Sequence, residues 1–358
     1  MSVPTAPERI DAPAHHLAGR VLDGEWQVRA RIEKAPDATG GHFSVGYHVE
    51  NADGERAFLK ALDYSEALGR PDVSVLLRNM TESYIFERSV LGECERRRMS
   101  RVVRVLAADT IVDPAFAHAV DYLIFEPADG DVRRALDSMD QFDTAWGLTV
   151  CHHAAVAIQQ MHSAGLAHQD VKPSNLLTFG GGLAKLGDLG RSSKRGTAAP
   201  HDDQRIRGDR SYAPPELLYG QLGPDWSVRC QACDLYLLGS LILFIFTRTQ
   251  TTGEILRRLP FVLRPEVYTE PYAQVLPYVV NAFDEVADDF ATQLEGERAS
   301  ELVKHFRDLC HPDPDQRGDA IERRRGKNPY SLRRLISRLD VLAHDARAGY
   351  LSKEAPSE

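Results

Sequence analysis

The chain has 358 residues, of which 43% are hydrophobic, and this is enough apolar material for the cores of two units of ordinary domain size. Its formal net charge is −9 and its pI is near 5.8, which argues against nucleic acid as the main partner, because binding to a phosphate backbone relies on clustered Lys and Arg. A basic stretch at 323–338 is a local exception of the kind typical of a solvated helix surface.

The start of the chain contains Pro, Glu and Arg instead of a continuous apolar run, so we expect no secretory signal and a cytoplasmic protein. The longest apolar stretch, 235–246, is shorter than the ~20 residues that span a bilayer and predicts a buried helix, with no membrane association. The five cysteines are expected to be reduced. Cys230 and Cys233 lack nearby partners that would complete a zinc site.

The first part of the chain is rich in β-type patterns. Three runs are separated by turns with glycine: 26–32, 43–49 and 56–62. They predict an antiparallel meander. A helix at about 73–97 should follow, then two strands near 102–107 and 119–126. Together these elements would form a small β-rich unit, which would end in a connecting segment at 126–130.

Apolar residues recur at helical spacing over 142–162 and predict a long helix. Residues 168–175 follow it and read His-Gln-Asp-Val-Lys-Pro-Ser-Asn. A short run at 183–186 could be a strand, and it leads into Gly-Asp-Leu-Gly at 187–190. A loop and a following hairpin could therefore bring Asp170, Asn175 and Asp188 together.

These residue types suit the transfer of a phosphoryl group. Mg²⁺ requires hard oxygen ligands, which the Asp188 carboxylate and the Asn175 amide would supply. Asp170 would accept the proton of an attacking hydroxyl, and Lys172 would present its ammonium to the transferred phosphate. The alternative for the first motif alone is a turn rich in Asp, Pro, Ser and Asn that only terminates structure.

The two motifs resemble the catalytic loop, His-Arg-Asp-x-Lys-x-x-Asn, and the metal loop, Asp-Phe-Gly, of the eukaryotic-type serine/threonine protein kinase family. Further landmarks of this family occur in its order: Ala-Phe-Leu-Lys at 57–60, Pro-Pro-Glu at 214–216, Asp-Leu-Tyr-Leu-Leu-Gly at 234–239 and Asp-Pro-Asp-Gln-Arg at 313–317. The resemblance covers roughly 25–320. It implies an α+β, bilobal fold with a small antiparallel β-rich N-lobe and a larger, mainly helical C-lobe. The Ala- and Arg-rich composition is similar to that of bacterial members.

The resemblance also implies a division of the chain. An N-terminal extension would occupy 1–24, the N-lobe 25–127, the C-lobe 128–322, and a C-terminal helix with a polar tail 323–358. The C-lobe is longer than a compact kinase needs, with an insert at about 251–298. The insert would be either extra helices packed on the lobe or a site for a partner. Apolar spacing over 330–342 predicts a helix that docks back on the C-lobe.

The resemblance implies ATP and Mg²⁺ as the bound groups, with Asp170, Lys172, Lys60 and a helix glutamate as catalytic residues. Lys60 would contact the α- and β-phosphates and pair with that glutamate. Glu82, Glu87 and Glu93 are the candidates, and Glu87 best fits the rhythm of the family's helix. The implied nucleotide-binding set comprises the phosphate-loop residues Gly41, Phe43 and Gly46, the strand residue Lys60, the hinge residues Glu126 and Ala128, and Asp131 near the ribose. Asn175 and Asp188 would hold the metal.

The chain departs from the family pattern at three places. The phosphate loop keeps only part of its Gly-x-Gly-x-x-Gly pattern. Gln169 replaces the arginine that binds a phosphorylated activation loop, which predicts activity without loop phosphorylation. Asp209 replaces a threonine and would place a further carboxylate near Asp170, raising the pKa of that group.

Three hydroxyl side chains of the loop that follows the metal motif, Ser192, Ser193 and Thr197, are possible autophosphorylation sites. Two structural contacts are also implied by the resemblance. Asp234 would accept hydrogen bonds from backbone N–H groups of the catalytic loop, and Glu216 would form a buried ion pair with Arg317.

The sequence therefore predicts an ATP-dependent serine/threonine protein kinase that acts on a protein hydroxyl. The alternatives are a pseudokinase scaffold and a small-molecule kinase, which has a similar bilobal fold. The scaffold is disfavoured because the strand lysine, the base and both metal ligands are present. The small-molecule kinase is disfavoured because the Pro-Pro-Glu segment, the buried-helix Asp and the late Arg are present. The target protein and the oligomeric state do not follow from one sequence.

Overall fold

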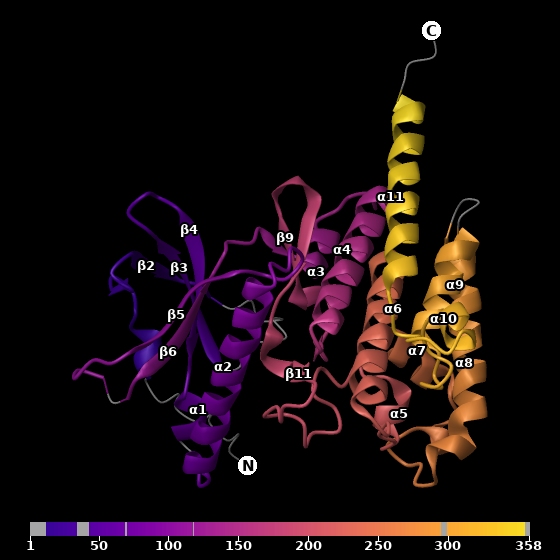
Figure 1. Ribbon diagram of the computed structural model, residues 1–358, viewed down its shortest axis with the longest axis horizontal. Coiled ribbons are helices and arrows are strands. Elements are labelled where there is room, and N and C mark those ends of the chain that lie inside the picture. The colour runs from indigo at the N-terminus through magenta and orange to yellow at the C-terminus, as the bar shows by residue number, and fades with distance from the viewer. Residues whose placement is uncertain (1–11, 34–42, 69, 117, 295–298, 355–358) are drawn as a thin grey trace, which may run out of the picture. The chain divides into compact units, whose positions relative to one another are not determined.

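The computed structural model describes residues 12–33, 43–68, 70–116, 118–294 and 299–354 (Figure 1). The chain divides into two compact units. The first consists of residues up to 98 together with 103–128, and the second consists of 99–102 together with 129–358. This division runs close to the boundary between 127 and 128 that separates the predicted lobes.

An antiparallel six-stranded sheet forms the body of the first unit, in the order β1-β2-β3-β4-β6-β5. The strands are β1 (Val21–Leu22), β2 (Trp26–Arg31), β3 (Ser44–Glu50), β4 (Arg56–Leu62), β5 (Val105–Ile111) and β6 (Val120–Phe125). The predicted meander is confirmed in β2, β3 and β4. The strand expected at 102–107 begins three residues later, because Val102 forms a parallel bridge with Leu186 in the second unit.

The segment before β2 is part of the sheet's core and not a separate extension. Ala14, Leu17 and Leu22 are buried in the cluster that also contains the inner face of the sheet. The Tyr47 hydroxyl donates to the Ala14 carbonyl at 2.8 Å, and His15 Nε2 lies 2.8 Å from Asp63 Oδ2. Residues 12–24 therefore belong to the N-terminal unit, whose predicted start at residue 25 is too late.

One long helix, α2 (Val73–Arg96), follows the short α1 (Ser65–Leu68) and confirms the predicted helix. It buries one face, with Tyr84, Glu87, Val90, Leu91 and Cys94. The Tyr84 hydroxyl donates to the carbonyls of Asp109 and Tyr122, which ties the helix to the sheet. Glu87 is a carboxylate on this buried face, and a buried charge requires a partner that neutralises it.

Helices dominate the second unit. They are α3 (Val132–Asp137), α4 (Thr144–Ser163), α5 (Pro215–Leu218), α6 (Ala232–Thr247), α7 (Thr251–Arg258), α8 (Tyr272–Gln293), α9 (Ala299–Cys310), α10 (Ala320–Arg324) and α11 (Arg333–Glu354). Short strands make two small sheets: β7 (Gly130–Asp131), β9 (Leu176–Phe179) and β10 (Leu183–Leu186) in one, β8 (Leu166–Ala167) and β11 (Ser193–Lys194) in the other. The bilobal α+β fold predicted from the sequence is confirmed.

The predicted central helices are present with shifted ends. Helix α4 begins at Thr144 because the Asp143 side chain accepts hydrogen bonds from the Ala145 and Trp146 amides, which caps the first turn. The apolar helix α6 continues a π-helical turn, so one helical stretch runs over Ser227–Thr247. Among the described residues this stretch alone has the length and composition to cross a membrane, but most of it is buried inside the protein, as in a core helix.

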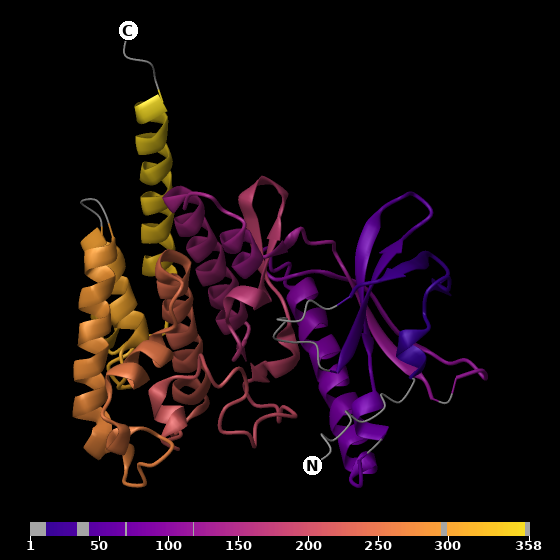
Figure 2. The same ribbon diagram turned by 180° about the vertical axis from the view of Figure 1, so that it is seen from behind.

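The predicted insert forms helices packed on the second unit. The buried face of α8 includes Val275, Val279, Phe283, Val286 and Phe290. The rings of Phe283 and Phe290 each contact Phe306 of α9, with ring centroids 5.4 Å apart. Helix α11 runs beside α4 (Figure 1 and Figure 2). It is longer than the predicted helix and buries Leu335, Leu339 and Leu342. The predicted docking of this helix is confirmed.

Gly239 of α6 provides a test of this helical packing. A Cβ added there would lie 2.4 Å from Cys310 Sγ and 2.9 Å from Leu309 Cβ. Gly239→Ala should therefore lower the free energy of unfolding by about 1–3 kcal/mol, in spite of alanine's better helix propensity. Gly253→Ala in α7 is the control, because no atom lies within 4 Å of its added Cβ. It should stabilise the protein by up to ~1 kcal/mol. Equal changes for the two variants in urea unfolding would refute this packing.

Candidate active site

In the first unit, Lys60 and Glu87 form the only predicted catalytic pair. Lys60 lies on β4, opposite Gly46 on β3 and Leu123 on β6. Its Nζ donates to both carboxylate oxygens of Glu87, at 3.0 and 3.1 Å. The Glu87 side chain is 8% exposed, so the lysine is what allows this carboxylate to be buried as an ion.

The other two glutamates considered from the sequence do not occupy this position. Glu93 pairs with Arg96 and Arg97 on the exposed face of α2, and the arginines hold the pKa of Glu93 at about 2. Glu82 is exposed. The structure therefore pairs Lys60 with Glu87, as the helix rhythm predicted. A contact of Lys60 with phosphate stays a prediction.

The remaining nucleotide-binding residues predicted in the first unit lie around these strands. Gly41 falls outside the described residues, and Phe43 is 46% exposed. Gly46 leaves room for a neighbouring ring, because a Cβ there would lie 2.9 Å from Phe58 Cε2. The Glu126 carboxylate accepts a hydrogen bond from the Arg104 amide at 2.8 Å. Half-buried Ala128 ends the unit.

Asp131, the predicted ribose contact, lies in the second unit at the start of α3. Its Oδ1 accepts the Arg134 amide at 3.0 Å and caps the helix. This capping bond explains an aspartate at this position without a ligand. Binding of a ribose hydroxyl by Asp131 stays a prediction.

The Asp234 side chain of α6 fixes the backbone of the catalytic loop through hydrogen bonds. One carboxylate oxygen of Asp234 accepts the His168 amide at 2.8 Å and His162 Nε2 at 2.9 Å, and the other accepts the Gln169 amide at 2.7 Å. Burial acts to raise the pKa of Asp234, but these hydrogen bonds outweigh it and lower the pKa. The predicted contact between this carboxylate and the loop's N–H groups is confirmed.

Asp170 lies at the centre of the second unit's polar cluster. Its Oδ2 accepts Asn175 Nδ2 at 2.9 Å and lies 3.1 Å from Lys172 Nζ, and its Oδ1 accepts the Asp209 amide at 2.8 Å. The residue is only 7% exposed. Burial raises the pKa of Asp170, with Asp188 acting in the same direction and Lys172 opposing it.

Asp209 acts on Asp170 through its backbone amide, and this hydrogen bond lowers the pKa of Asp170. The predicted effect of the Asp209 carboxylate on this pKa stays a prediction. The Asp209 carboxylate instead accepts the Ser211 amide and hydroxyl, at 2.9 and 2.7 Å, and lies 3.5 Å from Lys172 Nζ. Desolvation acts to lower the pKa of Lys172, but Asp170 and Asp209 outweigh it and raise the pKa, so the ammonium remains charged.

Asn175 and Asp188 are brought close together by the backbone. The Gly187 amide donates to the Asn175 carbonyl at 2.8 Å, and His168 Nε2 lies 2.9 Å from the Gly187 carbonyl. Asp188 itself has a left-handed backbone, with φ of 55°, a conformation that costs energy for a residue other than glycine. Such strain at a carboxylate is typical of a functional position.

The donor set fits Mg²⁺. Asn175 Nδ2 donates to the carbonyl and the carboxylate of Asp170. The Asn175 amide oxygen is a hard ligand of the kind that Mg²⁺ prefers. The Asp188 carboxylate would be the second ligand. Within the described ranges there is no cluster of three His, Cys, Asp or Glu side chains that could hold a metal ion. Mg²⁺ does not require one, because it is usually bound by one or two protein ligands, with phosphate oxygens and water.

A family model of the protein kinase domain matches residues 40–322. The chain belongs to the protein kinase family. It is 32% identical over 121 residues to Aurora/IPL1-related protein kinase 2 of Caenorhabditis briggsae, a match that covers 34% of this chain and 37% of the relative. It is 31% identical over 140 residues to serine/threonine-protein kinase CHK1 of Saccharomyces cerevisiae (37% and 25%), and 28% identical over 190 residues to serine/threonine-protein kinase RUNKEL of Arabidopsis thaliana (52% and 12%). The chain thus spans well under half the length of each of these relatives.

The activation segment, between Asp188 and Glu216, contains the three hydroxyls considered as autophosphorylation sites. Ser192 and Ser193 are fully buried, and Ser193 Oγ donates to Asp202 and accepts a bond from Trp226 Nε1. Thr197 is exposed. Of the three possible autophosphorylation sites, only Thr197 is therefore accessible in this conformation.

One residue of this site, Arg207, was not predicted from the sequence. Arg207 donates to Gln169 Oε1 at 2.9 Å, within the catalytic loop. Arg205, Arg207 and Arg210 look alike in the sequence, and no local pattern distinguishes the one that turns inward. The available signal was Gln169 itself, because a neutral side chain in place of the family's arginine leaves room for a cation from another segment.

Proposed function

We propose that this kinase transfers the γ-phosphate of ATP to a serine or threonine hydroxyl of a protein. The observation that carries the proposal is the hydrogen-bonded set of Asp170, Lys172 and Asn175, held beside Asp188. In this set a buried carboxylate, an ammonium and two hard oxygen ligands each have one task in phosphoryl transfer. The proposal draws support from the kinase family model and from relatives named serine/threonine kinases.

Each residue's part follows from its contacts. Asp170 would accept the proton of the substrate hydroxyl, oriented for this by the Asn175 amide and the Asp209 N–H. Lys172 would stabilise negative charge on the transferred group. Asn175 and Asp188 would hold Mg²⁺, which when bound neutralises charge on the phosphate oxygens. In the first unit, Lys60 would bind the α- and β-phosphates while Glu87 fixes its ammonium.

We also propose that the enzyme is active without phosphorylation of its activation segment. Gln169 cannot bind a phosphate as the family's arginine does. Its amide is already engaged, since Nε2 donates to Asp234 Oδ1 at 3.0 Å and to the Cys230 carbonyl at 2.8 Å. A phosphate on the segment would therefore have no cation at this position of the catalytic loop.

The experiment is transfer of labelled phosphate from ATP to a generic protein such as casein, with Mg²⁺ or with a chelator. We expect transfer in Mg²⁺ alone. Glu87→Gln should lower it at least tenfold, because the neutral amide no longer holds the Lys60 ammonium in place. Glu93→Gln is the matched control, since Glu93 lies on the same helix and pairs with two surface arginines, Arg96 and Arg97.

A second readout is the stabilisation of the protein by ATP and Mg²⁺ in thermal unfolding. At a ligand concentration of about 100 times Kd this should reach about 2.7 kcal/mol, and Glu87→Gln should reduce it while Glu93→Gln should not. Absence of both transfer and stabilisation in the wild-type protein would reject the proposed function. Stabilisation without transfer would favour a nucleotide-binding scaffold.

A further inference from the structure

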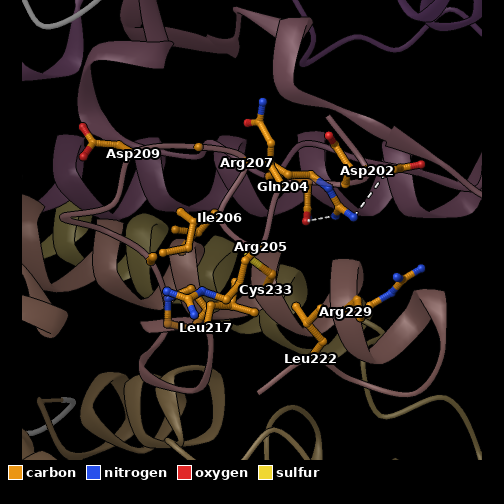
Figure 3. Close-up of a pocket in the computed structure, with 16 residues that line it drawn as sticks. Asp202, Gln204, Arg205, Ile206, Arg207, Asp209, Leu217, Leu222, Arg229 and Cys233 are labelled. Atoms are coloured by element: carbon orange, nitrogen blue, oxygen red, sulfur yellow. Dashed lines mark hydrogen bonds and ion pairs between the residues drawn. The ribbon is translucent and has the colours of Figure 1, made fainter. Parts of the chain in front are cut away.

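Arg207 is a nearly buried cation in a surface segment, with 7% of its side chain exposed. Its guanidinium is fully engaged: Nη1 donates to Gln169 Oε1 at 2.9 Å and to Cys230 Sγ at 3.2 Å, Nε to the His201 carbonyl at 3.2 Å, and Nη2 pairs with Asp202 Oδ1 at 3.2 Å. Figure 3 shows Arg207 and Asp202 side by side in the wall of a pocket. Arg207 thus binds the activation segment to the catalytic loop.

The carboxylate that neutralises Arg207 is itself fixed. Asp202 Oδ2 accepts the Ala199 amide at 2.8 Å, and Oδ1 accepts Ser193 Oγ at 3.2 Å. The same Ser193 hydroxyl accepts Trp226 Nε1 at 3.0 Å. A fixed anion that meets a guanidinium in a partly desolvated place forms stronger hydrogen bonds than neutral partners do. Asp202 therefore presents a fixed negative charge to Arg207.

Arg207 lies two residues before Asp209, whose backbone amide binds the proposed base Asp170. Gly208 passes so close to the catalytic loop that a Cβ there would lie 2.4 Å from the Gln169 carbonyl oxygen and 2.6 Å from Asp170 Oδ1. The next amide, that of Asp209, donates to Asp170 Oδ1 at 2.8 Å. Because the Arg207 contacts fix the start of this stretch, they set the position of the Asp209 N–H that orients Asp170.

We propose that the Asp202–Arg207 ion pair is a built-in replacement for an activation-segment phosphate, and that both are positioning residues for Asp170. In the family pattern the catalytic loop supplies an arginine and the segment supplies a phosphate. Here the segment supplies the cation, Arg207, and the catalytic loop supplies the neutral Gln169. The anion is the Asp202 carboxylate, which needs no prior modification. This inference rests on the proposed kinase function, but it makes a structural prediction that can be tested without activity.

The test compares Arg207→Ala with Arg205→Ala. Arg205 lines the same pocket (Figure 3), is exposed, and has no ion pair within the described part of the chain. In Arg207→Ala the Gly208 and Asp209 amides should exchange hydrogen about tenfold faster or more, because their segment opens more readily. The kcat should fall by about 10- to 100-fold, as expected for a misplaced base, with KM for ATP little changed. Arg205→Ala should match wild type in all three measurements.

Asp202→Asn keeps the side-chain shape and removes the charge, so it should show the same pattern more weakly and serves if Arg207→Ala does not fold. Wild-type enzyme treated with a phosphatase should keep its kcat within about twofold, since no phosphate is required. Unchanged amide exchange in both variants, or loss of activity on phosphatase treatment, would overturn the inference. If wild-type enzyme transfers no phosphate at all, the proposed function fails, while the exchange rates still decide whether Arg207 holds the segment.

Discussion

Asp170→Asn should lower kcat by about 10²- to 10⁴-fold, the contribution typical of a positioned general base. Asparagine occupies the same volume but cannot accept a proton from the substrate hydroxyl. Since both oxygens of Asp170 accept hydrogen bonds, from Asn175 and from the Asp209 amide, the new NH₂ group must face a donor. Steady-state transfer to protein at saturating ATP measures the effect, and thermal unfolding of the variant separates lost chemistry from lost folding.

Nucleotide binding provides the internal control for this variant. Asp170 is not among the predicted metal ligands, so stabilisation by ATP and Mg²⁺ should survive in Asp170→Asn. Asp203→Asn is the matched control for the substitution itself, since Asp203 is an exposed aspartate of the same part of the chain. It should keep wild-type kcat. Equal kcat in Asp170→Asn and wild type would exclude Asp170 as the base.

The pKa of Asp170 adds a pH dependence with a definite sign. Burial raises this pKa above the ordinary value of 3.8, and a base acts only when it is deprotonated. The acidic limb of kcat/KM should therefore fall as pH drops through a value above 3.8. Because burial disfavours the charged form of Asp170, the folded protein binds a proton at this carboxylate more readily than the unfolded chain does. The contribution of Asp170 to the free energy of unfolding should therefore increase as pH falls through the raised pKa.

Short-range patterns predicted much of the fold. Alternation located β2 to β4, because each strand is only six or seven residues long and half-buried. Lys60 was identified by the resemblance of residues 57–60 to the family's strand motif. Glu87 was chosen over Glu82 and Glu93 by its resemblance to the family's helix, and it lies on the buried face of α2. The catalytic loop was found for the same reason, since Asp170, Lys172 and Asn175 lie within six residues and need no tertiary information to be grouped.

The remaining features depend on contacts between distant parts of the chain. Arg207 meets Gln169 across 38 positions, and no local pattern specifies which of several loop arginines turns inward. The hydrogen bond from the Asp209 amide to Asp170 was not foreseen, because a backbone contact leaves no mark in the residue types. The packing of residues 12–24 also escaped prediction, since Ala14 and Leu17 have too few apolar neighbours in sequence to show a period.

The strongest expected effect on stability is at the ion pair of Arg317 with Glu216. Arg317 is completely buried and Glu216 nearly so, and the pair is bidentate, with Nη1–Oε1 at 2.7 Å and Nη2–Oε2 at 2.9 Å. The pairing predicted from the sequence is confirmed. Removing one partner of such a pair leaves an uncompensated buried charge, which costs about 3–5 kcal/mol. Arg317→Met and Glu216→Gln should each lower the free energy of unfolding strongly.

The two variants should not be equal. Arg317 also donates to the carbonyls of His311 and Ala232, at 3.0 and 3.2 Å, so its loss leaves further buried acceptors without donors. Arg317→Met should therefore cost more than Glu216→Gln. Arg338→Met is the matched control, because its pair with Glu301 lies at the surface and should contribute far less to stability than the buried pair.

A double-mutant cycle then separates the pair from its surroundings. The double variant Glu216→Gln/Arg317→Met should lose less than the sum of the single losses, since neither charge is left alone. Chemical unfolding of the four proteins gives the coupling. A sum that is fully additive, or an Arg317→Met loss no larger than that of Arg338→Met, would show that the pair does not anchor the activation segment. Coupling larger than about 1 kcal/mol would show that Glu216 and Arg317 stabilise the fold through their interaction with each other.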